Sequence, residues 1–330
     1  MEVWSGTRSV FLAALIACST HAAVAQELMR VRIGLASPSL PGAAARIANV
    51  MGLFAKNGLD ATVLQMDNGS VAMMGLLSGS VDFTTASGAD VVVSQSRGQQ
   101  IVAVLSIYHG FAGQLVLSES VVSARKITAD APTDTKVKVL DDLVLASSSA
   151  TSPFTIALRS AAESVGAKIR IVYMSQPAMP AALSTGSIQG FISSSPYYAR
   201  PVLDGTAVLW LSGPKGEFPS LATPANSMTL NTRADFARTH VDLVNRVRAV
   251  FTDFAHAVVE RPGEVKAAVA KLFPDLDPKT LDLLFKTESR GWEGGTVTVD
   301  DMVHEIAVVK SSGVPLPDVN KLEPRNMLLK

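Results

Sequence analysis

The chain has 330 residues, and its 29 Lys and Arg residues balance its 29 Asp and Glu residues, so the formal net charge is zero. This balance argues against nucleic acid as the main partner, because nucleic-acid-binding domains carry a basic excess. Hydrophobic residues make up 48% of the chain, which argues against a disordered protein, and the length suggests two lobes or one large domain.

The first 25 residues have the order of a secretory leader. Arg8 precedes an apolar run that ends at Cys18 and is too short to span a bilayer, and Ala23 and Ala25 stand where a signal peptidase needs small residues. We therefore expect a signal peptide over residues 1–25, cleaved after Ala25. Alternatively, the four residues that end at Cys18 resemble a lipobox, and Cys18 would then carry a lipid anchor. Since Cys18 is the only cysteine, cleavage after Ala25 leaves no thiol for a disulfide, a nucleophile or a metal site.

After the leader, apolar strands alternate with helices. We expect strands over residues 31–36, 61–66, 81–85, 101–107, 143–146, 169–173 and 188–192. Each is followed by a loop rich in Ser, Gly or Pro and then by a helix that ends near a glycine, which predicts βαβ units and parallel sheets. Beyond residue 232 the pattern is helical, over residues 233–260, 262–272, 277–286 and 298–312.

Several helix starts can be read from the sequence. Ser70, Ser87 and Ser152 precede apolar helical patterns and are expected to be N-caps, and Ser195-Pro196 is expected to open a helix. Thr298 with Asp301 three residues later resembles a capping box.

Two short runs of the first half recur in the second half. Leu35-Ala36-Ser37 returns as Leu145-Ala146-Ser147, and residues 78–82 (SGSVD) return as residues 185–189 (TGSIQ). The recurrence predicts two similar lobes in place of one continuous sheet.

The loops that follow the strands have an unusual composition. They cover residues 37–41, 68–70, 86–88, 147–153, 175–177 and 193–196 and contain hydroxyl groups and glycines but no Lys, Arg or Glu, and Asp67 is their only carboxylate neighbour. In a parallel sheet these loops share one edge with the amino ends of the helices, where free N–H groups favour an anion. We therefore expect a ligand site of uncharged hydrogen-bond donors, although any one serine here is often only a helix cap.

Motifs for catalysis are missing from the sequence. His304-Glu305 lacks the second histidine of a zinc helix, Gly186–Gly190 lacks the G-x-S-x-G order, and neither a G-x-G-x-x-G run nor a Walker loop occurs. We therefore expect no enzyme, no catalytic residue, no metal site and no cofactor.

Five runs of residues carry a resemblance to a known family. They are Met51–Asp60, Gly75–Phe83, Arg97–Val104, Ala181–Pro196 and Asn231–Arg246. Together they resemble the periplasmic solute-binding proteins of ABC importers, in the nitrate/sulfonate/taurine and NMT1/THI5-like branch. The chain departs from the usual pattern at Gln189-Gly190, Val241 and Leu140–Val144, which leaves the ligand subgroup open.

The resemblance implies an α/β fold of type 2 periplasmic binding proteins, with two lobes that each hold a parallel or mixed sheet flanked by helices. Lobe one would cover residues 26–113 and 226–330 and lobe two residues 114–225, with crossings near residues 111–117 and 221–230. The ligand would lie in the cleft between the lobes, at Ser37, Ser39, Leu40, Gly69, Ser70, Ser87, Gly88, Thr151, Ser152, Ser194, Ser195 and Asn226. Tyr108 and Tyr197, near the same loops, are expected to pack against an apolar part of the ligand.

The function that the resemblance implies is that of a monomeric receptor in the periplasm. It would capture a small organic anion, sulfonate- or carboxylate-like, and deliver it to an ABC permease and its ATPase in the inner membrane. Three alternatives stay open. They are a binder of a neutral heterocycle or pyrimidine such as a thiamine precursor, a sensor or scavenging lobe without a transporter, and a secreted α/β hydrolase.

Overall fold

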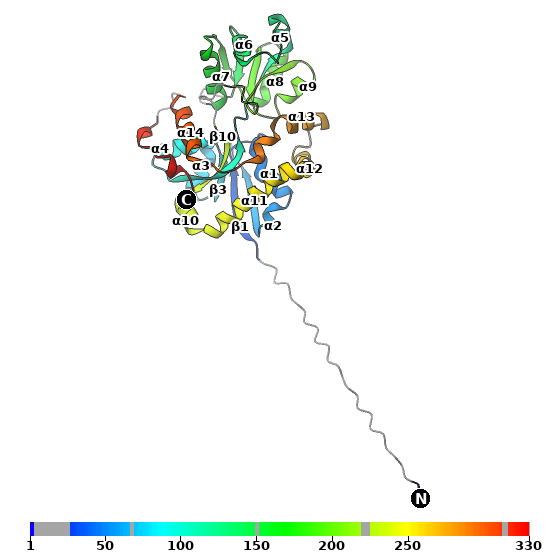
Figure 1. Cartoon of the computed structure of the whole chain (residues 1–330), viewed down its shortest axis with the longest axis vertical. Coiled ribbons are helices and arrows are strands. Elements are labelled where there is room, and N and C mark those ends of the chain that lie inside the picture. Colours follow the sequence, from blue (N-terminus) through cyan, green and yellow to red (C-terminus); the bar gives the residue numbers. More distant parts are fainter. Residues whose placement is uncertain (3–26, 67–68, 149–151, 219–224, 312–315, 330) are drawn as a thin grey trace.

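The computed structural model describes residues 1–2, 27–66, 69–148, 152–218, 225–311 and 316–329. The predicted leader, with Cys18 and the cleavage site after Ala25, lies outside these ranges, as do Thr151 and residues 221–224 of the second predicted crossing. None of the described helices is long and apolar enough to cross a membrane. Figure 1 shows two lobes stacked along the long axis of the molecule.

The lower lobe in Figure 1 contains a five-stranded sheet in the order β2-β1-β3-β10-β4. Its strands are β1 (Met29–Leu35), β2 (Leu59–Gln65), β3 (Phe83–Ala86), β4 (Ile101–His109) and β10 (Asn226–Arg233). Strand β1 is parallel to β2 and β3, whereas β10 is antiparallel to β3 and β4. Its helices are α1 (Ala44–Val50), α2 (Leu53–Lys56), α3 (Gly69–Ser78), α4 (Gly88–Ser96), α10 (Ala234–Thr239), α11 (Val241–Glu260), α12 (Pro262–Leu272), α13 (Pro278–Glu288) and α14 (Val299–Ser311). Short 3-10 turns lie at Pro41–Ala43, Ser289–Glu293, Val319–Lys321 and Pro324–Met327.

The upper lobe repeats this topology with the order β7-β6-β8-β5-β9. Its strands are β5 (Gln114–Ser118), β6 (Val144–Ser147), β7 (Arg170–Tyr173), β8 (Gly190–Ser193) and β9 (Ala207–Ser212). Its helices are α5 (Glu119–Arg125), α6 (Thr133–Lys138), α7 (Pro153–Ser164), α8 (Met179–Ser184, after a 3-10 turn at Gln176–Ala178) and α9 (Ala199–Leu203). The recurring Leu-Ala-Ser runs lie at the ends of β1 and β6, which occupy equivalent places, so the prediction of two similar lobes is confirmed.

Both sheets are mixed, as the family resemblance allowed, although the strand–helix pattern alone predicted parallel strands. The antiparallel members are β5 and β10, the strands by which the chain enters the upper sheet and returns to the lower one. The sequence pattern missed β10 because its buried positions hold polar residues: Thr229, Asn231 and Thr232 are fully buried. A central strand with so many polar side chains lacks the apolar run by which such strands are usually found.

Some helices begin where the sequence predicted, and others begin at a different residue. Asp90 N donates to Ser87 Oγ at 3.2 Å in a complete capping box at the start of α4, and Ser152 caps α7 by accepting from Phe154 N. Ser70 is not a cap, since α3 already begins at Gly69. Ser195-Pro196 does not open a helix either, because α9 begins only at Ala199.

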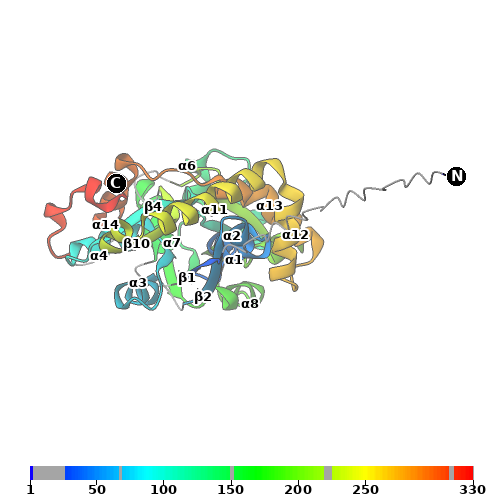
Figure 2. The ribbon, with the colours of Figure 1, turned by 90° about the horizontal axis from the view of Figure 1, so that it is seen from below.

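The helices of the last third join the two lobes. Figure 2 shows α11 crossing the lower lobe from the side of α14 to that of α12, and its buried side, which includes Val247 and Phe254, belongs to the main hydrophobic core. That core continues into the upper lobe through Phe191 and Tyr198. Helix α13 lies directly below the upper lobe in Figure 1 and packs against α9, so the lobes meet over a dense contact.

Candidate functional site

Two of the loops at the carboxyl ends of the strands, those after β1 and β8, meet where the lobes touch. Leu40 N, in the loop after β1, donates to the carbonyl oxygen of Ser195, in the loop after β8, at 3.2 Å. We call this junction the seam, and we include in it the loops after β2 and β3, which follow the two strands that flank β1 in the lower sheet. The seam also comprises the first residues of β5 and β10 and Glu288 at the end of α13. As a polar junction between two sheets, the seam is where a ligand of an open α/β fold is expected.

The structure brings most of the predicted residues into the seam. In the lower lobe, Ser37 Oγ donates to Ser39 Oγ at 2.8 Å beside Leu40. In the upper lobe, Ser194 N donates to Gln176 Oε1 at 2.9 Å and Ser195 is fully buried. The remaining predicted members of this group are Gly69, Ser87, Gly88 and Asn226, which contact two carboxyl groups described below.

Four predicted residues lie apart from this group. Tyr108 is buried in the core of the lower lobe, where its hydroxyl donates to the Glu288 carbonyl oxygen and its ring meets Trp292 edge to face. Ser70 is exposed, Ser152 caps α7, and Tyr197 is half-buried, and no hydrogen bond among the described residues joins these three to the seam. Their role in binding stays a prediction, as does that of Thr151, which lies outside the described residues.

Asp90 is the first of three carboxyl groups in this region. Its Oδ2 atom accepts from Ser87 N at 3.0 Å and from Ser87 Oγ at 2.7 Å. The same carboxyl group lies against Gly69, since a Cβ atom there would be 2.5 Å from Oδ2. Burial raises the pKa of Asp90 above its ordinary value, against the effect of the Ser87 hydrogen bonds. One carboxyl group therefore faces the amino ends of both α3 and α4.

Glu305 of α14 is the second carboxyl group and has no exposed surface. Its Oε1 atom accepts from Asn226 N at 3.1 Å, and a Cβ atom on Gly88 would lie 2.8 Å from its Cδ atom. Burial raises its pKa to about 8, with smaller contributions from the nearby Asp301 and Asp90. At neutral pH this carboxyl group is therefore mostly protonated.

Glu288, the last residue of α13, is the third carboxyl group, and it links the two lobes. It is 3% exposed, and its Oε2 atom accepts a short hydrogen bond from Ser195 Oγ. Burial raises its pKa to about 7, although the side chains of Ser195, Tyr198 and Gln114 act to lower it. A carboxyl group of the lower lobe is thus desolvated against the upper lobe.

Several buried polar atoms lack a hydrogen-bond partner among the described residues. Most of them lie on strands that end at the seam, whereas Ser106 lies in the middle of β4 beside Gly295. The atoms are Thr85 Oγ1, Ser106 Oγ, Gln114 Nε2 and Oε1, Ser193 Oγ, Ser212 Oγ, Asn226 Nδ2, Glu288 Oε1 and Glu305 Oε2. The Gln114 side chain and Glu288 nevertheless interact with each other, since Gln114 acts to lower the pKa of Glu288. Gln114 stands in register with Ser193 on one side and Ser212 on the other, so these three form one row across the upper sheet. An unpaired buried polar group costs about 1–3 kcal/mol, so such a concentration indicates a place for a polar molecule.

Only one of the three carboxyl groups has a recognisable signal in the sequence. Ser87, with Asp90 three residues later, has the spacing of a capping box, so Asp90 could have been identified from the sequence. Glu288 and Glu305 lie far along the chain, on helices whose other inward residues are mostly apolar, and only the tertiary fold brings them to the seam. In the folded chain these three carboxyl groups lie close to the loops, although Asp67 is the only carboxylate next to the loops in the sequence.

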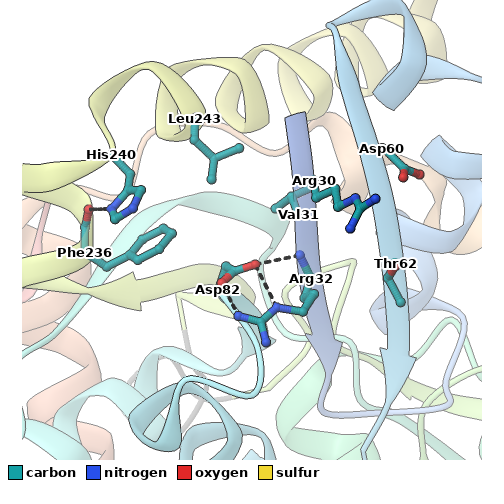
Figure 3. A pocket seen from close by; sticks show the side chains of 9 residues that line it. All are labelled: Arg30, Val31, Arg32, Asp60, Thr62, Asp82, Phe236, His240 and Leu243. Carbon is teal, nitrogen blue, oxygen red and sulfur yellow. Dashed lines mark hydrogen bonds and ion pairs between the residues drawn. The ribbon is translucent and has the colours of Figure 1, made fainter. Parts of the chain in front are cut away.

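Other hollows lie on the outer surface of the lower lobe. The one in Figure 3, about 590 Å³, lies at the amino ends of β1 and β2 and includes Arg30 and Leu243 in its lining. Within it, Arg32 forms an ion pair with Asp82 at 2.7 Å, and the His240 ring stacks on Phe236 with centroids 4.1 Å apart. None of the predicted ligand residues lines this hollow, and its stacked and paired groups already have partners. No group of three or more potential metal ligands occurs in the described part of the chain.

Comparison with known proteins bears on the family and the fold. The model of the NMT1-like family matches residues 25–272, whereas no curated protein matches the chain. The periplasmic aliphatic sulphonate binding protein SsuA from Escherichia coli is similar in structure, with a TM-score of 0.69 and 15% identity over 91% of this chain and 98% of that chain.

Two further structures are similar. The alkanesulfonate-binding protein SsuA from Xanthomonas axonopodis pv. citri, bound to MOPS, has a TM-score of 0.68 and 15% identity over 92% of this chain and 99% of that chain. The periplasmic nitrate-binding protein NrtA from Synechocystis PCC 6803 has a TM-score of 0.56 and 13% identity over 91% of this chain and 87% of that chain. At such identities the likeness concerns the fold, and it confirms the predicted two-lobed α/β fold of periplasmic binding proteins.

Proposed function

Because this chain belongs to the NMT1-like family, we propose that it is an extracytoplasmic receptor that holds a small solute between its lobes and delivers it to an ABC permease and its ATPase. The observation that carries the proposal is the group of buried, unpaired polar atoms along the seam. A solute that forms hydrogen bonds with these atoms offsets the free-energy cost of burying them, and it does so only while the two lobes are in contact. The solute therefore stabilises the closed state.

The lobe boundaries follow from where the chain changes sheets. We place lobe one at residues 26–113 and 226–330 and lobe two at residues 114–225, since β5 begins at Gln114 and β10 at Asn226. These two crossings would be the hinge, and the receptor would work as a monomer in the periplasm after cleavage behind Ala25.

The class of ligand is the finer part of the proposal. A sulfonate- or carboxylate-like anion is supported by the uncharged donors at the helix amino ends and by the structural similarity to the aliphatic sulphonate and alkanesulfonate binding proteins. A neutral heterocycle is supported by Asp90, Glu288 and Glu305, which put acids where an anion binder needs cations.

Catalysis fits the seam less well than binding. A secreted hydrolase needs an accessible serine beside a general base. Ser195 has no exposed surface and donates its hydroxyl proton to Glu288, so a substrate carbonyl does not reach it in this state. We propose that the solute leaves the protein chemically unchanged.

The test is ligand binding by the exported protein. The mature chain, freed of bound solute by partial unfolding and refolding, is screened by thermal unfolding against sulfonates, nitrate, aromatic carboxylates and pyrimidines. A solute at 100 times its dissociation constant should add about 2.7 kcal/mol to the free energy of unfolding. Mass spectrometry should recover the solute intact.

Paired variants separate a receptor from an enzyme. Asn226→Ala removes a buried seam amide and should weaken binding, whereas Asn245→Ala, on the exposed side of α11, should not. Hydrolysis of an ester or amide by the wild type that a single serine substitution abolishes would favour the hydrolase instead.

A further inference from the structure

One carboxyl group of the lower lobe has its side-chain partners in the upper lobe. Glu288, the last residue of α13, is 3% exposed, and its Oε2 atom accepts a short hydrogen bond from Ser195 Oγ. Gln114 and Tyr198, which also belong to the upper lobe, interact with the same carboxyl group. The Glu288 side chain therefore lies against three side chains of the opposite lobe.

The surroundings of Glu288 tie it to both lobes. Its own carbonyl oxygen accepts from Tyr108 Oη at 3.1 Å, which fixes the end of α13 to β4 of the lower lobe. On the side of the upper lobe, Tyr198 Oη lies 2.9 Å from Thr287 Oγ1, and the Ser195 carbonyl oxygen accepts from Leu40 N at 3.2 Å. A movement that separates the lobes here therefore breaks the contact between Glu288 and Ser195.

No cation neutralises this carboxyl group. Among the described residues, no Lys or Arg forms an ion pair with Glu288. The titratable groups that face it are Tyr108 and Tyr198, and burial raises the pKa of both hydroxyls, so they stay neutral. Lys279 and Lys286, on α13 itself, are exposed. Charged groups on α13 and on the elements packed against it form pairs with one another: Arg200 with Asp204 and Asp277, Lys266 with Asp282, and Arg290 with Glu293.

Such a contact suits the protonated form of Glu288. A carboxylate that is buried without a cation is costly, whereas a protonated carboxyl group can donate to one neighbour while it accepts from Ser195. Burial accordingly raises the pKa of Glu288 to about 7, from an ordinary value of 4.5. Separation of the lobes would let water reach the carboxyl group and would lower its pKa again.

Resting on the hinged receptor proposed above, we infer that Glu288 is a positioning residue for closure: its protonated carboxyl group holds the two lobes together, and loss of the proton releases them. The residue acts on the solute through the position of the lobes. Acid conditions therefore favour the closed state and retention of the solute, and alkaline conditions favour opening and release.

The size of the effect follows from the pKa of Glu288 in the two states. The closed state binds the proton more tightly than the open state does, so a fall in pH favours closure. With a pKa of about 7 in the closed state and about 4.5 when water reaches the group, the ratio of closed to open molecules should fall about tenfold between pH 6 and pH 8.

Distances between two spin labels measure this ratio in the absence of a solute. Cys18 is the only cysteine and lies in the predicted leader, so a mature chain that begins after Ala25 has no thiol of its own. Met74→Cys on α3 and Ser184→Cys on α8 place one label at an exposed position of each lobe. Pulsed electron paramagnetic resonance should give a short and a long distance, and the ratio of short to long should fall about tenfold between pH 6 and pH 8.

Two variants of the labelled chain complete the test. Glu288→Gln keeps nearly the same shape and stays uncharged, so its ratio should not change with pH. Glu264→Gln, at an exposed position of α12, is the matched control and should follow the wild type. Circular dichroism at each pH checks that the chains are folded.

The wild type alone can overturn the inference, because its pH profile needs no variant that folds. A wild-type ratio that stays constant between pH 6 and pH 8, or one that changes equally in Glu288→Gln, would overturn it. The receptor function would stand in either case, since the solute screen tests it separately.

Discussion

Glu288→Gln should make the protein's stability less sensitive to pH and raise it above pH 7. The pKa of Glu288 in the folded protein is about 7, against an ordinary value of 4.5, and the carboxyl group is 3% exposed. The folded state therefore holds this proton more tightly than the unfolded state does. The contribution of the protonated Glu288 carboxyl group to the free energy of unfolding is full below pH 4.5, declines between pH 4.5 and pH 7, and is lost above pH 7.

The size of the effect follows from the difference in pKa. A shift from 4.5 to about 7 corresponds to a free energy of unfolding that falls by on the order of 3 kcal/mol across this range. Glutamine has nearly the same shape and stays uncharged, so the variant escapes this loss. Relative to the wild type, it should gain on the order of 3 kcal/mol between pH 4.5 and pH 8.

Urea unfolding at several pH values measures this difference. Glu305 also titrates in the wild type, but it is present in both proteins and cancels in the comparison. Glu163→Gln, at an exposed position of α7, is the control and should follow the wild type. A difference between Glu288→Gln and the wild type that does not change with pH would refute the claim that this carboxyl group is protonated in the seam.

Three further substitutions test packing around the seam and the upper lobe. Gly69→Ala should lower the free energy of unfolding by about 1–3 kcal/mol, because its Cβ atom would lie 2.5 Å from a carboxyl oxygen, whereas Gly263→Ala, with open space around it, should change it by less than about 1 kcal/mol. Ser195→Ala removes the hydroxyl that donates to a buried carboxyl group and should cost about 1–3 kcal/mol in urea unfolding. Lys136→Ala leaves Glu217, which is 26% exposed, without its partner, and calorimetry should record a loss of about 3 kcal/mol; an unchanged melting temperature would contradict the buried ion pair.

The regular part of the fold could be predicted from the sequence because local signals agree with the tertiary structure there. Apolar runs mark β1, β2 and β4, and Ser87 and Ser152 mark the starts of α4 and α7. The crossover strands escaped prediction because their burial is decided by neighbours distant in the chain. Strand β10 places Thr229 and Asn231 in the middle of a sheet, where they bond to each other and to β3.

The site could be predicted only in outline. The serine-rich loops pointed to the correct edge of each sheet, since helix caps and ligand donors use the same residues. The charge of the site could not be predicted, because Glu288 and Glu305 belong to helices of the last third and reach the loops only through packing on β10 and the upper lobe. This late contribution adds two buried carboxyl groups with raised pKa values to a set of uncharged donors.

A crystal structure of the mature protein with the solute that raises its melting temperature most tests the central claim most directly. We expect the solute to lie in the seam, in contact with both lobes and within hydrogen-bond distance of Gln114, Asn226 and at least one of the two glutamates. A solute that contacts one lobe only, or that occupies the outer hollow between Arg30 and His240 in Figure 3, would contradict it.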